Sequence, residues 1–263
     1  MENKFLLWEN APGLLAGEEI PILTYYPSDK KTTKATVVIC PGGGYRIRAP
    51  HEGEGYAKFL NAAGYDAFVV DYRVAPYRFP YPLLDARRAV RFVRHNAEKF
   101  DIDPNRIAIM GSSAGGHLSA LLSTYRAELE DEGADEIDNE SYLPSAQILC
   151  YPVIDRAGHF GSYENLLGPG NEEMDALVNP ALIADEATPK CFLWHTNEDK
   201  SVDVCNSYRY VARLKELGVP VEMHIFPYGR HGLGLAPGEE HDHLRKWADL
   251  MLDWLKLIGF ACD

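Results

Sequence analysis

A nucleophilic serine is indicated by residues 111–115, Gly-Ser-Ser-Ala-Gly, which have the pattern G-x-S-x-G. The motif directly follows the apolar run RIAIM and directly precedes a helix-forming segment, GHLSALL. A strand that turns sharply into a helix leaves Ser113 in a strained backbone conformation with its hydroxyl exposed, and only glycine fits on either side, at Gly111 and Gly115. Ser113 would lie at the N-terminus of that helix, where the helix dipole favours a developing negative charge.

The base that such a serine requires must come from one of nine histidines, because a hydroxyl is a poor nucleophile until its proton is accepted. His231 follows the apolar run VEMHIF, in a loop that would hold its imidazole near the carboxyl edge of a sheet. His195 ends another apolar run and is the main competitor. His117 is expected to be a core histidine, and His224 a packing or surface residue. Surface or cap positions are expected for His51, His95, His159, His241 and His243.

An acidic residue is needed to fix the tautomer of the base and to stabilise its cation. Asp199 lies in the segment WHTNEDKSV, just past the apolar run that ends at His195. The chain order is then Ser113, Asp199, His231, which serine hydrolases built on a parallel sheet also use. Glu198 is the alternative acid. Asp203 is expected to begin the following helix, where a carboxylate caps backbone donors.

Backbone donors for an oxyanion are predicted at Gly42-Gly43-Gly44, directly after the apolar run TVVIC and Pro41. Such glycine loops supply N–H groups to a tetrahedral intermediate. We expect the donors to be the amides of Gly43 and Gly44, with Ala114 as the third. The alternative, a phosphate-binding loop, lacks the Lys-Ser/Thr pair of a nucleotide site. This chemistry needs neither a cofactor nor a metal, and we expect none.

Six apolar runs are continuous enough to form strands that are buried on both faces of a sheet. They are residues 36–40, 67–73, 106–111, 145–154, 191–195 and 221–226. The spacing of apolar residues predicts helices over 81–97, 203–217 and 239–258. The alternation of strands and helices indicates an α/β fold, with a mostly parallel central sheet covered by helices on both faces and a single domain over residues 1–263.

Residues 155–189 break this alternation and are too long for a plain connection. They follow a strand end, where α/β sheets bind ligands, so we predict a small cap over the site. The segment offers few apolar residues beyond Phe160, Leu166, Leu167 and Leu177. Bulky and polar residues 45–48, Tyr-Arg-Ile-Arg, follow the glycine loop. Both segments predict a small acyl pocket, because a long acyl chain gains free energy only in an apolar groove.

Composition limits the possible partners. The chain is 46% hydrophobic and 25% charged, as is usual for globular proteins. Its net charge of −13 argues against a nucleic-acid partner, which needs a cationic surface. Residues 126–141 carry eight acids and one base. We predict a solvated surface loop there, with a partner-binding acidic patch as the alternative.

The cysteines and the N-terminal segment bear on location. Five cysteines without a CxxC pair are expected to be core thiols in a reducing compartment: Cys40, Cys150, Cys191, Cys205 and Cys262. The first residues, MENKFLLWENAPGLL, lack the cationic start and continuous apolar core of a signal peptide. No run approaches the ~20 apolar residues that span a bilayer. We therefore expect a cytoplasmic protein without membrane contact.

Four motifs resemble those of a family of bacterial α/β-hydrolase esterases. This family includes acetyl xylan esterase-like and feruloyl esterase-like members and is related to the hormone-sensitive-lipase group. The motifs are PGGGY (41–45), GSSAGGHL (111–118), DKSV (199–202) and RHGLGL (230–235), and the likeness extends over about residues 20–258. The resemblance implies an α/β-hydrolase fold and hydrolysis of short-chain, in particular acetyl, esters of xylo-oligosaccharides or other small alcohols. Pro41 departs from the HGGG motif, and Glu198 stands where relatives often have glycine or alanine.

Other functions on the same scaffold are compatible with these motifs. An arylformamidase would use the same serine chemistry on an amide. A peptidase of this fold usually carries a propeller domain, and no blade repeat is visible in the sequence. A non-catalytic binding protein is disfavoured by the intact serine, histidine and aspartate together with an intact glycine loop.

Overall fold

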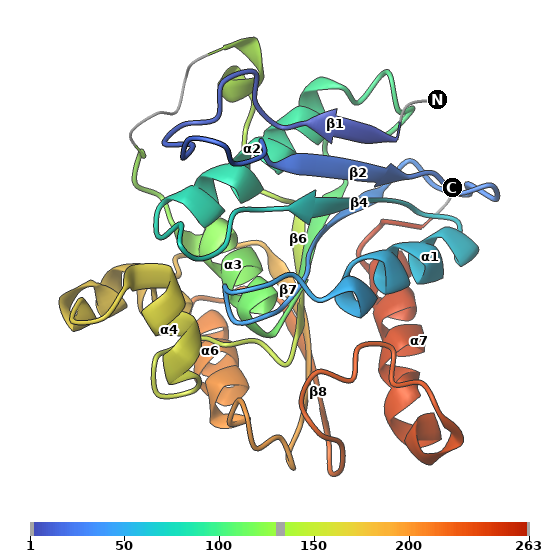
Figure 1. Ribbon diagram of the computed structural model, residues 1–263. Coiled ribbons are helices and arrows are strands. Elements are labelled where there is room, and N and C mark those ends of the chain that lie inside the picture. Colours follow the sequence, from blue (N-terminus) through green and yellow to red (C-terminus); the bar gives the residue numbers. More distant parts are fainter. Residues whose placement is uncertain (1–2, 130–134, 262–263) are drawn as a thin grey trace.

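A mostly parallel sheet runs through the middle of the computed structural model, which describes residues 3–129 and 135–261 (Figure 1). Within these residues, eight strands lie in the order β1-β2-β4-β3-β5-β6-β7-β8. β1 and β4 each pair antiparallel with β2, and the later pairings are parallel. The strands are β1 (Lys4–Leu6), β2 (Ile22–Tyr26), β3 (Thr36–Cys40), β4 (Asp66–Asp71), β5 (Ile107–Ser112), β6 (Ala146–Cys150), β7 (Lys190–Thr196) and β8 (Val221–Phe226).

All six predicted strands are present, and their residues are mostly buried except in β8, which is half-buried up to Phe226. β6 is shorter than the predicted 145–154, because the chain turns at Tyr151, whose φ of +38° is incompatible with a strand. β1 and β2 were not predicted. β2 alternates buried and half-buried residues, the pattern of a strand with only one covered face, and it lacks a continuous apolar run.

Helices cover both faces of the sheet. Val38 and Cys40 of β3 pack into the core layer of α2 and α3, whereas Val37 and Ile39 pack into the layer of α1 and α7. Figure 1 shows α6 on the same side as α3. The helices are α1 (Glu54–Ala62), α2 (Tyr81–His95), α3 (Ser113–Thr124), α4 (Phe160–Leu167), α5 (Pro180–Ile183), α6 (Cys205–Glu216) and α7 (Asp242–Leu257), with short 3₁₀ turns η1 (Pro50–Glu52), η2 (Glu136–Asn139), η3 (Glu172–Val178) and η4 (Glu239–His241).

The predicted helices over 81–97, 203–217 and 239–258 correspond to α2, α6 and α7, each within a few residues. Between β6 and β7, residues 155–189 fold into α4, η3 and α5. His117 of α3 joins this segment to the glycine loop, since its Nε2 lies 2.8 Å from the Val178 carbonyl oxygen and its Nδ1 lies 2.7 Å from the Tyr45 hydroxyl. The segment is therefore packed against the sheet domain through a buried polar contact.

The acidic stretch 126–141 is only partly a solvated loop. Asp135 and Asp138 form ion pairs with Arg88 of α2, at 2.5 and 3.0 Å, and Asp138 is buried. The prediction of a solvated surface loop was therefore wrong for Asp138, whereas Asp135 is exposed as expected; both carboxylates hold η2 against α2. Residues 130–134 of the stretch lie outside the described residues.

Three of the cysteines, Cys40, Cys150 and Cys191, are buried thiols as predicted. Cys205 is exposed at the start of α6, so its assignment to the core was wrong. Cys262 lies outside the described residues. No helix in residues 3–129 or 135–261 combines the length and the apolar character that crossing a membrane requires.

The closest backbone packing near the serine motif predicts a stability change. In Gly115→Ala the added Cβ would lie 2.1 Å from the Cys40 carbonyl oxygen and 2.5 Å from that of Pro41. We expect this overpacking to lower the free energy of unfolding by roughly 1–3 kcal/mol. Gly55→Ala, in α1, is the matched control: nothing in the described chain lies within 4 Å of its added Cβ. Urea unfolding should show it neutral or slightly stabilised; equal losses in both variants would contradict the steric argument.

Candidate active site

Ser113 is the first residue of α3 and follows β5 directly. Its φ is +53°, a left-handed conformation that is strained for a residue with a side chain. The close packing of its glycine neighbours holds this turn: a Cβ on Gly111 would lie 2.1 Å from the Gly115 carbonyl oxygen. The strained turn with obligatory glycines, which the G-x-S-x-G pattern predicted, is thus present at the carboxyl edge of the sheet.

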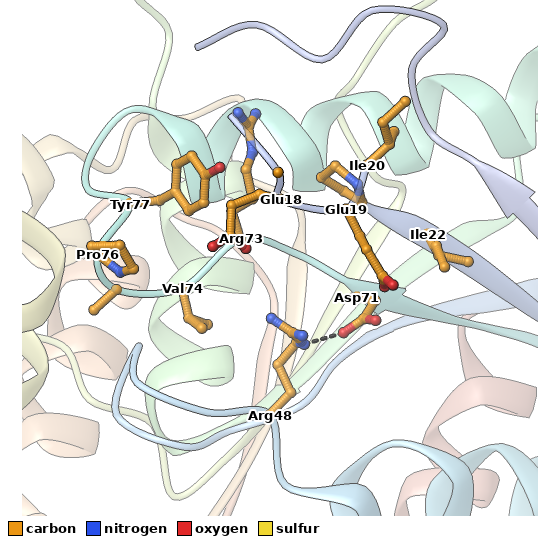
Figure 2. A pocket seen from close by; sticks show the side chains of 13 residues that line it. Glu18, Glu19, Ile20, Ile22, Arg48, Asp71, Arg73, Val74, Pro76 and Tyr77 are labelled. Carbon is orange, nitrogen blue, oxygen red and sulfur yellow. Dashed lines mark ion pairs between the residues drawn. The ribbon is translucent and has the colours of Figure 1, made fainter. Parts of the chain in front are cut away.

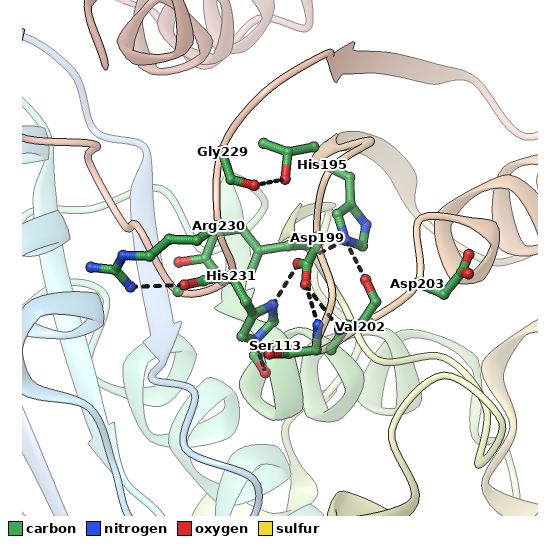
Figure 3. A network of polar contacts seen from close by, with 12 residues as sticks. Ser113, His195, Asp199, Val202, Asp203, Gly229, Arg230 and His231 are labelled. Carbon is green, nitrogen blue, oxygen red and sulfur yellow. Dashed lines mark hydrogen bonds and ion pairs between the residues drawn. The ribbon is translucent and has the colours of Figure 1, made fainter. Parts of the chain in front are cut away.

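The loops after β7 and β8 bring an acid and a histidine to Ser113 (Figure 3). His231 Nε2 lies 2.8 Å from Ser113 Oγ, and His231 Nδ1 lies 2.6 Å from Asp199 Oδ2. Because the carboxylate accepts, Nδ1 carries the proton and Nε2 is left to accept from the serine hydroxyl. This arrangement can activate an alcohol as a nucleophile.

Asp199 is held by four hydrogen bonds. Its Oδ1 accepts from the backbone amides of Ser201 and Val202, both at 2.9 Å, and its Oδ2 accepts from His231 and, at 3.2 Å, from His195 Nε2. Burial alone would raise the pKa of Asp199. The hydrogen bonds from the two histidines, the charge of His231 and the Val202 amide outweigh burial and bring the pKa well below its usual value. The carboxylate is therefore ionised at neutral pH.

The competing residues considered from the sequence occupy other positions. His195 lies behind Asp199, fully buried, with Nδ1 2.7 Å from the Ser207 hydroxyl, and it orients the acid from the side opposite His231. The exposed Glu198 accepts from the Gly229 amide at 3.1 Å. His224, half-buried in β8, pairs with Glu222. Asp203 accepts from the Cys205 amide at the start of α6.

Gly43 and Gly44 of the glycine loop line the same pocket as Ser113 and His231. The Gly42 carbonyl oxygen accepts from the Ala49 amide, and the Gly43 carbonyl oxygen accepts from the Arg46 and Ile47 amides. Since N–H and C=O point in opposite directions across a trans peptide, the amides of Gly43 and Gly44 are turned away from these donors. Neither amide donates to a protein acceptor in the described residues. Ala114 N–H lies in the first turn of α3, where amides have no partner within the helix.

The pocket at Ser113 has a volume of about 500 Å³. Three residues of the 155–189 segment line it: His159, Gly161 and Asn165. His51, for which a surface position was expected, also lines the pocket and contacts the His231 loop through a 3.0 Å bond from Nε2 to the Gly232 carbonyl oxygen. His51, His159 and Asn165 thus bring polar side chains to the pocket from η1 and from α4 with its N-cap.

The segment 45–48 contributes less to this pocket than its sequence suggested. Arg46 and Ile47 line it, but Tyr45 is buried against His117. Arg48 pairs with Asp71 at the rim of a different hollow of about 300 Å³, shown in Figure 2. Arg73, also in that hollow, is already bound to Asp85. Both arginines of this hollow are therefore already paired with carboxylates.

Glu52 and Asn165, which line the pocket, and Tyr151, which packs against His231, were among the residues not singled out from the sequence. Glu52 and Asn165 stand in polar segments that read as ordinary loops. Tyr151 fell inside the predicted strand 145–154, and only the structure, in which β6 ends at Cys150, places it at the carboxyl edge of the sheet.

The sequence matches the model of the BD-FAE family over residues 23–214, a range that contains Ser113 and Asp199. This chain belongs to the BD-FAE family. The resemblance to bacterial α/β-hydrolase esterases that the four motifs predicted is thereby confirmed.

Individual relatives agree with this membership. The chain is 37% identical over 228 residues to endo-1,4-beta-xylanase B of Butyrivibrio fibrisolvens, and 33% identical over 232 residues to the acetylxylan esterase of Xylanibacter ruminicola. Each alignment covers 84% of this chain, which spans only 36% and 45% of the lengths of these relatives. The acetyl ester-xyloside bifunctional hydrolase of Caldicellulosiruptor lactoaceticus superimposes with a TM-score of 0.92 at 42% identity, covering 98% of this chain and 97% of that one. The predicted α/β-hydrolase fold is confirmed.

The buried His117 predicts a pH-dependent stability. Burial lowers the pKa of His117 from 6.5 to about 4. As the pH falls, His117 is therefore protonated in the unfolded chain before it is protonated in the folded protein. The contribution of neutral His117 to the free energy of unfolding is complete above about pH 6.5 and is lost as the pH falls toward 4. As the pH falls over that range, the free energy of unfolding of the unsubstituted protein should decrease by up to about 3 kcal/mol more than that of His117→Gln. The measurement is urea unfolding at several pH values, with the exposed His243→Gln as control; parallel curves for all three proteins would contradict the prediction.

Proposed function

We propose that this chain is a serine carboxylesterase that hydrolyses short-chain esters, acetyl esters foremost, with Ser113, His231 and Asp199 as its catalytic triad. The observation that carries the proposal is the continuous set of contacts from Ser113 Oγ to His231 Nε2, at 2.8 Å, and from His231 Nδ1 to Asp199 Oδ2, at 2.6 Å. Membership of the BD-FAE family supports the same chemistry.

In the first half of the reaction, Ser113 Oγ attacks the ester carbonyl carbon while its proton passes to His231 Nε2. The carbonyl oxygen becomes an oxyanion, and the amides of Gly43, Gly44 and Ala114 donate to it. Because these amides are held by the fold before substrate arrives, their dipoles need no reorganisation as the charge develops.

Collapse of the tetrahedral intermediate breaks the bond to the alcohol, which leaves with the proton from His231 and leaves an acyl group on Ser113. Asp199 stabilises the imidazolium that exists between these two proton transfers. Water then attacks the acyl group, again giving its proton to His231, and the acid is released as Ser113 Oγ takes the proton back.

A small acyl group and a hydroxylated alcohol suit the pocket. Its lining includes Arg46, His51, His159, Asn165 and Ser201, and these side chains offer hydrogen bonds to hydroxyl groups. A long acyl chain gains ~0.8 kcal/mol per methylene only where an apolar groove receives it. Since two of the relatives are named for acetyl esters and xylan or xylosides, we extend the proposal to acetylated xylo-oligosaccharides.

The segment 155–189 acts in this proposal as a small cap within one domain, because its residues 159–165 face Ser113 across the pocket. A reducing compartment such as the cytoplasm suits the chain, since Cys40, Cys150, Cys191 and Cys205 are free thiols.

A substrate series tests the proposal. We expect kcat/KM on p-nitrophenyl esters to be greatest at acetate and to fall toward octanoate, and acetate to be released from acetylated xylo-oligosaccharides. Ser113→Ala, folded as judged by circular dichroism, should lose about 10⁶ in kcat. A kcat/KM that is greatest at eight carbons, or an N-formylarylamide as the best substrate, would contradict the proposed acyl group. A folded Ser113→Ala variant that keeps a few per cent of the activity would contradict the proposed catalytic triad.

The two neighbouring acids give a matched pair of variants. Asp199→Asn should lower kcat by about 10⁴, because an amide stabilises the wrong tautomer of His231. Glu198→Gln should change kcat by less than about threefold, since Glu198 contacts Gly229 instead. Because the pKa of Asp199 is lowered, protonation of Asp199 should cause no loss of kcat/KM near the usual aspartate pKa of ~4. A larger effect of Glu198→Gln than of Asp199→Asn would refute this assignment.

A further inference from the structure

A buried carboxylate lies between the glycine loop and the His231 loop. Glu52 ends the turn η1, and only 3% of its surface is exposed. Its Oε2 accepts from the Gly42 amide at 2.9 Å, and its Oε1 accepts from the Tyr151 hydroxyl at 2.6 Å. Acidic side chains are almost never this buried unless their oxygens are bonded, so the two donors account for its position.

Tyr151 continues the connection to the histidine. Its hydroxyl accepts from the Gly234 amide at 2.9 Å, three residues after His231. Its ring packs edge-on against the imidazole of His231, with 5.1 Å between ring centroids. The positive φ of Tyr151 is unfavourable for a residue with a side chain and persists only where the surroundings hold it. Tyr151 is therefore held in place between Glu52 of η1 and the His231 loop.

The turn η1 makes a second contact with the same loop. His51 Nε2 lies 3.0 Å from the Gly232 carbonyl oxygen, and a Cβ on Gly234 would lie 3.1 Å from the His51 ring. Adjacent residues of η1 thus reach the His231 loop by two routes, one at its surface through His51 and one buried through Glu52 and Tyr151.

We propose that Glu52 and Tyr151 are positioning residues that together hold the oxyanion amides at a fixed distance from His231. The Gly42 amide is the first anchored peptide of the glycine loop, and the next two peptides carry the amides of Gly43 and Gly44. The bond to Glu52 therefore sets where these amides lie, and the bond from Tyr151 ties that position to the histidine loop. The inference rests on the proposed esterase function.

Positioning of the oxyanion amides by Glu52 and Tyr151 affects the transition state more than substrate binding. Oxyanion donors bond the tetrahedral oxygen far better than the ground-state carbonyl, so a small displacement lowers kcat and leaves KM nearly unchanged. A general loss of packing would instead change stability and KM as well.

The experiment compares Tyr151→Phe, Glu52→Gln and the double variant by steady-state kinetics on p-nitrophenyl acetate. Phenylalanine removes the hydroxyl, and a neutral amide can accept from only one of the two donors. We expect each single variant to lower kcat about ten- to a hundredfold, with KM within about threefold. Because both act through one connection, the double variant should be no slower than the slower single one. Tyr210→Phe, which removes a buried hydroxyl bonded to Gln147 at 3.0 Å, is the control and should leave kcat unchanged.

A transition-state analogue supplies a second readout. The inhibition constant of a methyl trifluoromethyl ketone, which adds Ser113 to form a tetrahedral oxyanion, should rise by the same factor as kcat/KM falls. Unchanged kcat in Tyr151→Phe, or independent multiplicative losses in the double variant, would overturn the inference; if Glu52→Gln does not fold, Tyr151→Phe still decides. Failure of the esterase proposal itself would give a different result. Either the unsubstituted protein would not hydrolyse the ester, or the Ser113→Ala variant would still hydrolyse it.

Discussion

The close approach of α3 to the end of β3 is the constraint on which the site depends. Gly115 lies so near the carbonyl groups of Cys40 and Pro41 that no side chain fits between them. This contact places the strained Ser113 turn directly beside the glycine loop that leaves β3. The serine hydroxyl and the glycine loop, whose amides we propose as oxyanion donors, therefore come to one pocket through backbone packing.

The acid and the histidine are held beside Ser113 by polar groups whose hydrogen-bonding atoms all have partners. Asp199 receives two amides and two imidazoles, so its carboxylate cannot rotate away from His231. His195, which might have served as the base by its position in the sequence, instead supports the acid. Buried polar groups satisfied in this way are rigid, and rigidity is what a proton transfer over hydrogen-bond distance requires.

The pocket itself is assembled from segments that are far apart in the chain. Residues near 46–52, 159–165 and 231–232 meet around Ser113, and each belongs to a loop whose ends are set by the sheet or by a short helix. Side chains that can hydrogen-bond, among them His51, His159 and Asn165, are part of this lining. In the proposed esterase reaction they bind the hydroxyl groups of the substrate alcohol.

The sequence by itself determined the class of fold, because continuous apolar runs such as 36–40 can be satisfied only in a sheet covered on both faces. It also singled out Ser113, Asp199 and His231 as candidates, since each directly follows a strand run and parallel strands end at one edge. Tertiary structure alone decided that His195 lies behind the acid, that Arg48 turns to another hollow, and that Glu52 connects two loops. These outcomes depend on contacts between residues up to 99 positions apart, as between Glu52 and Tyr151, and local sequence patterns contain no information about which distant partners will meet.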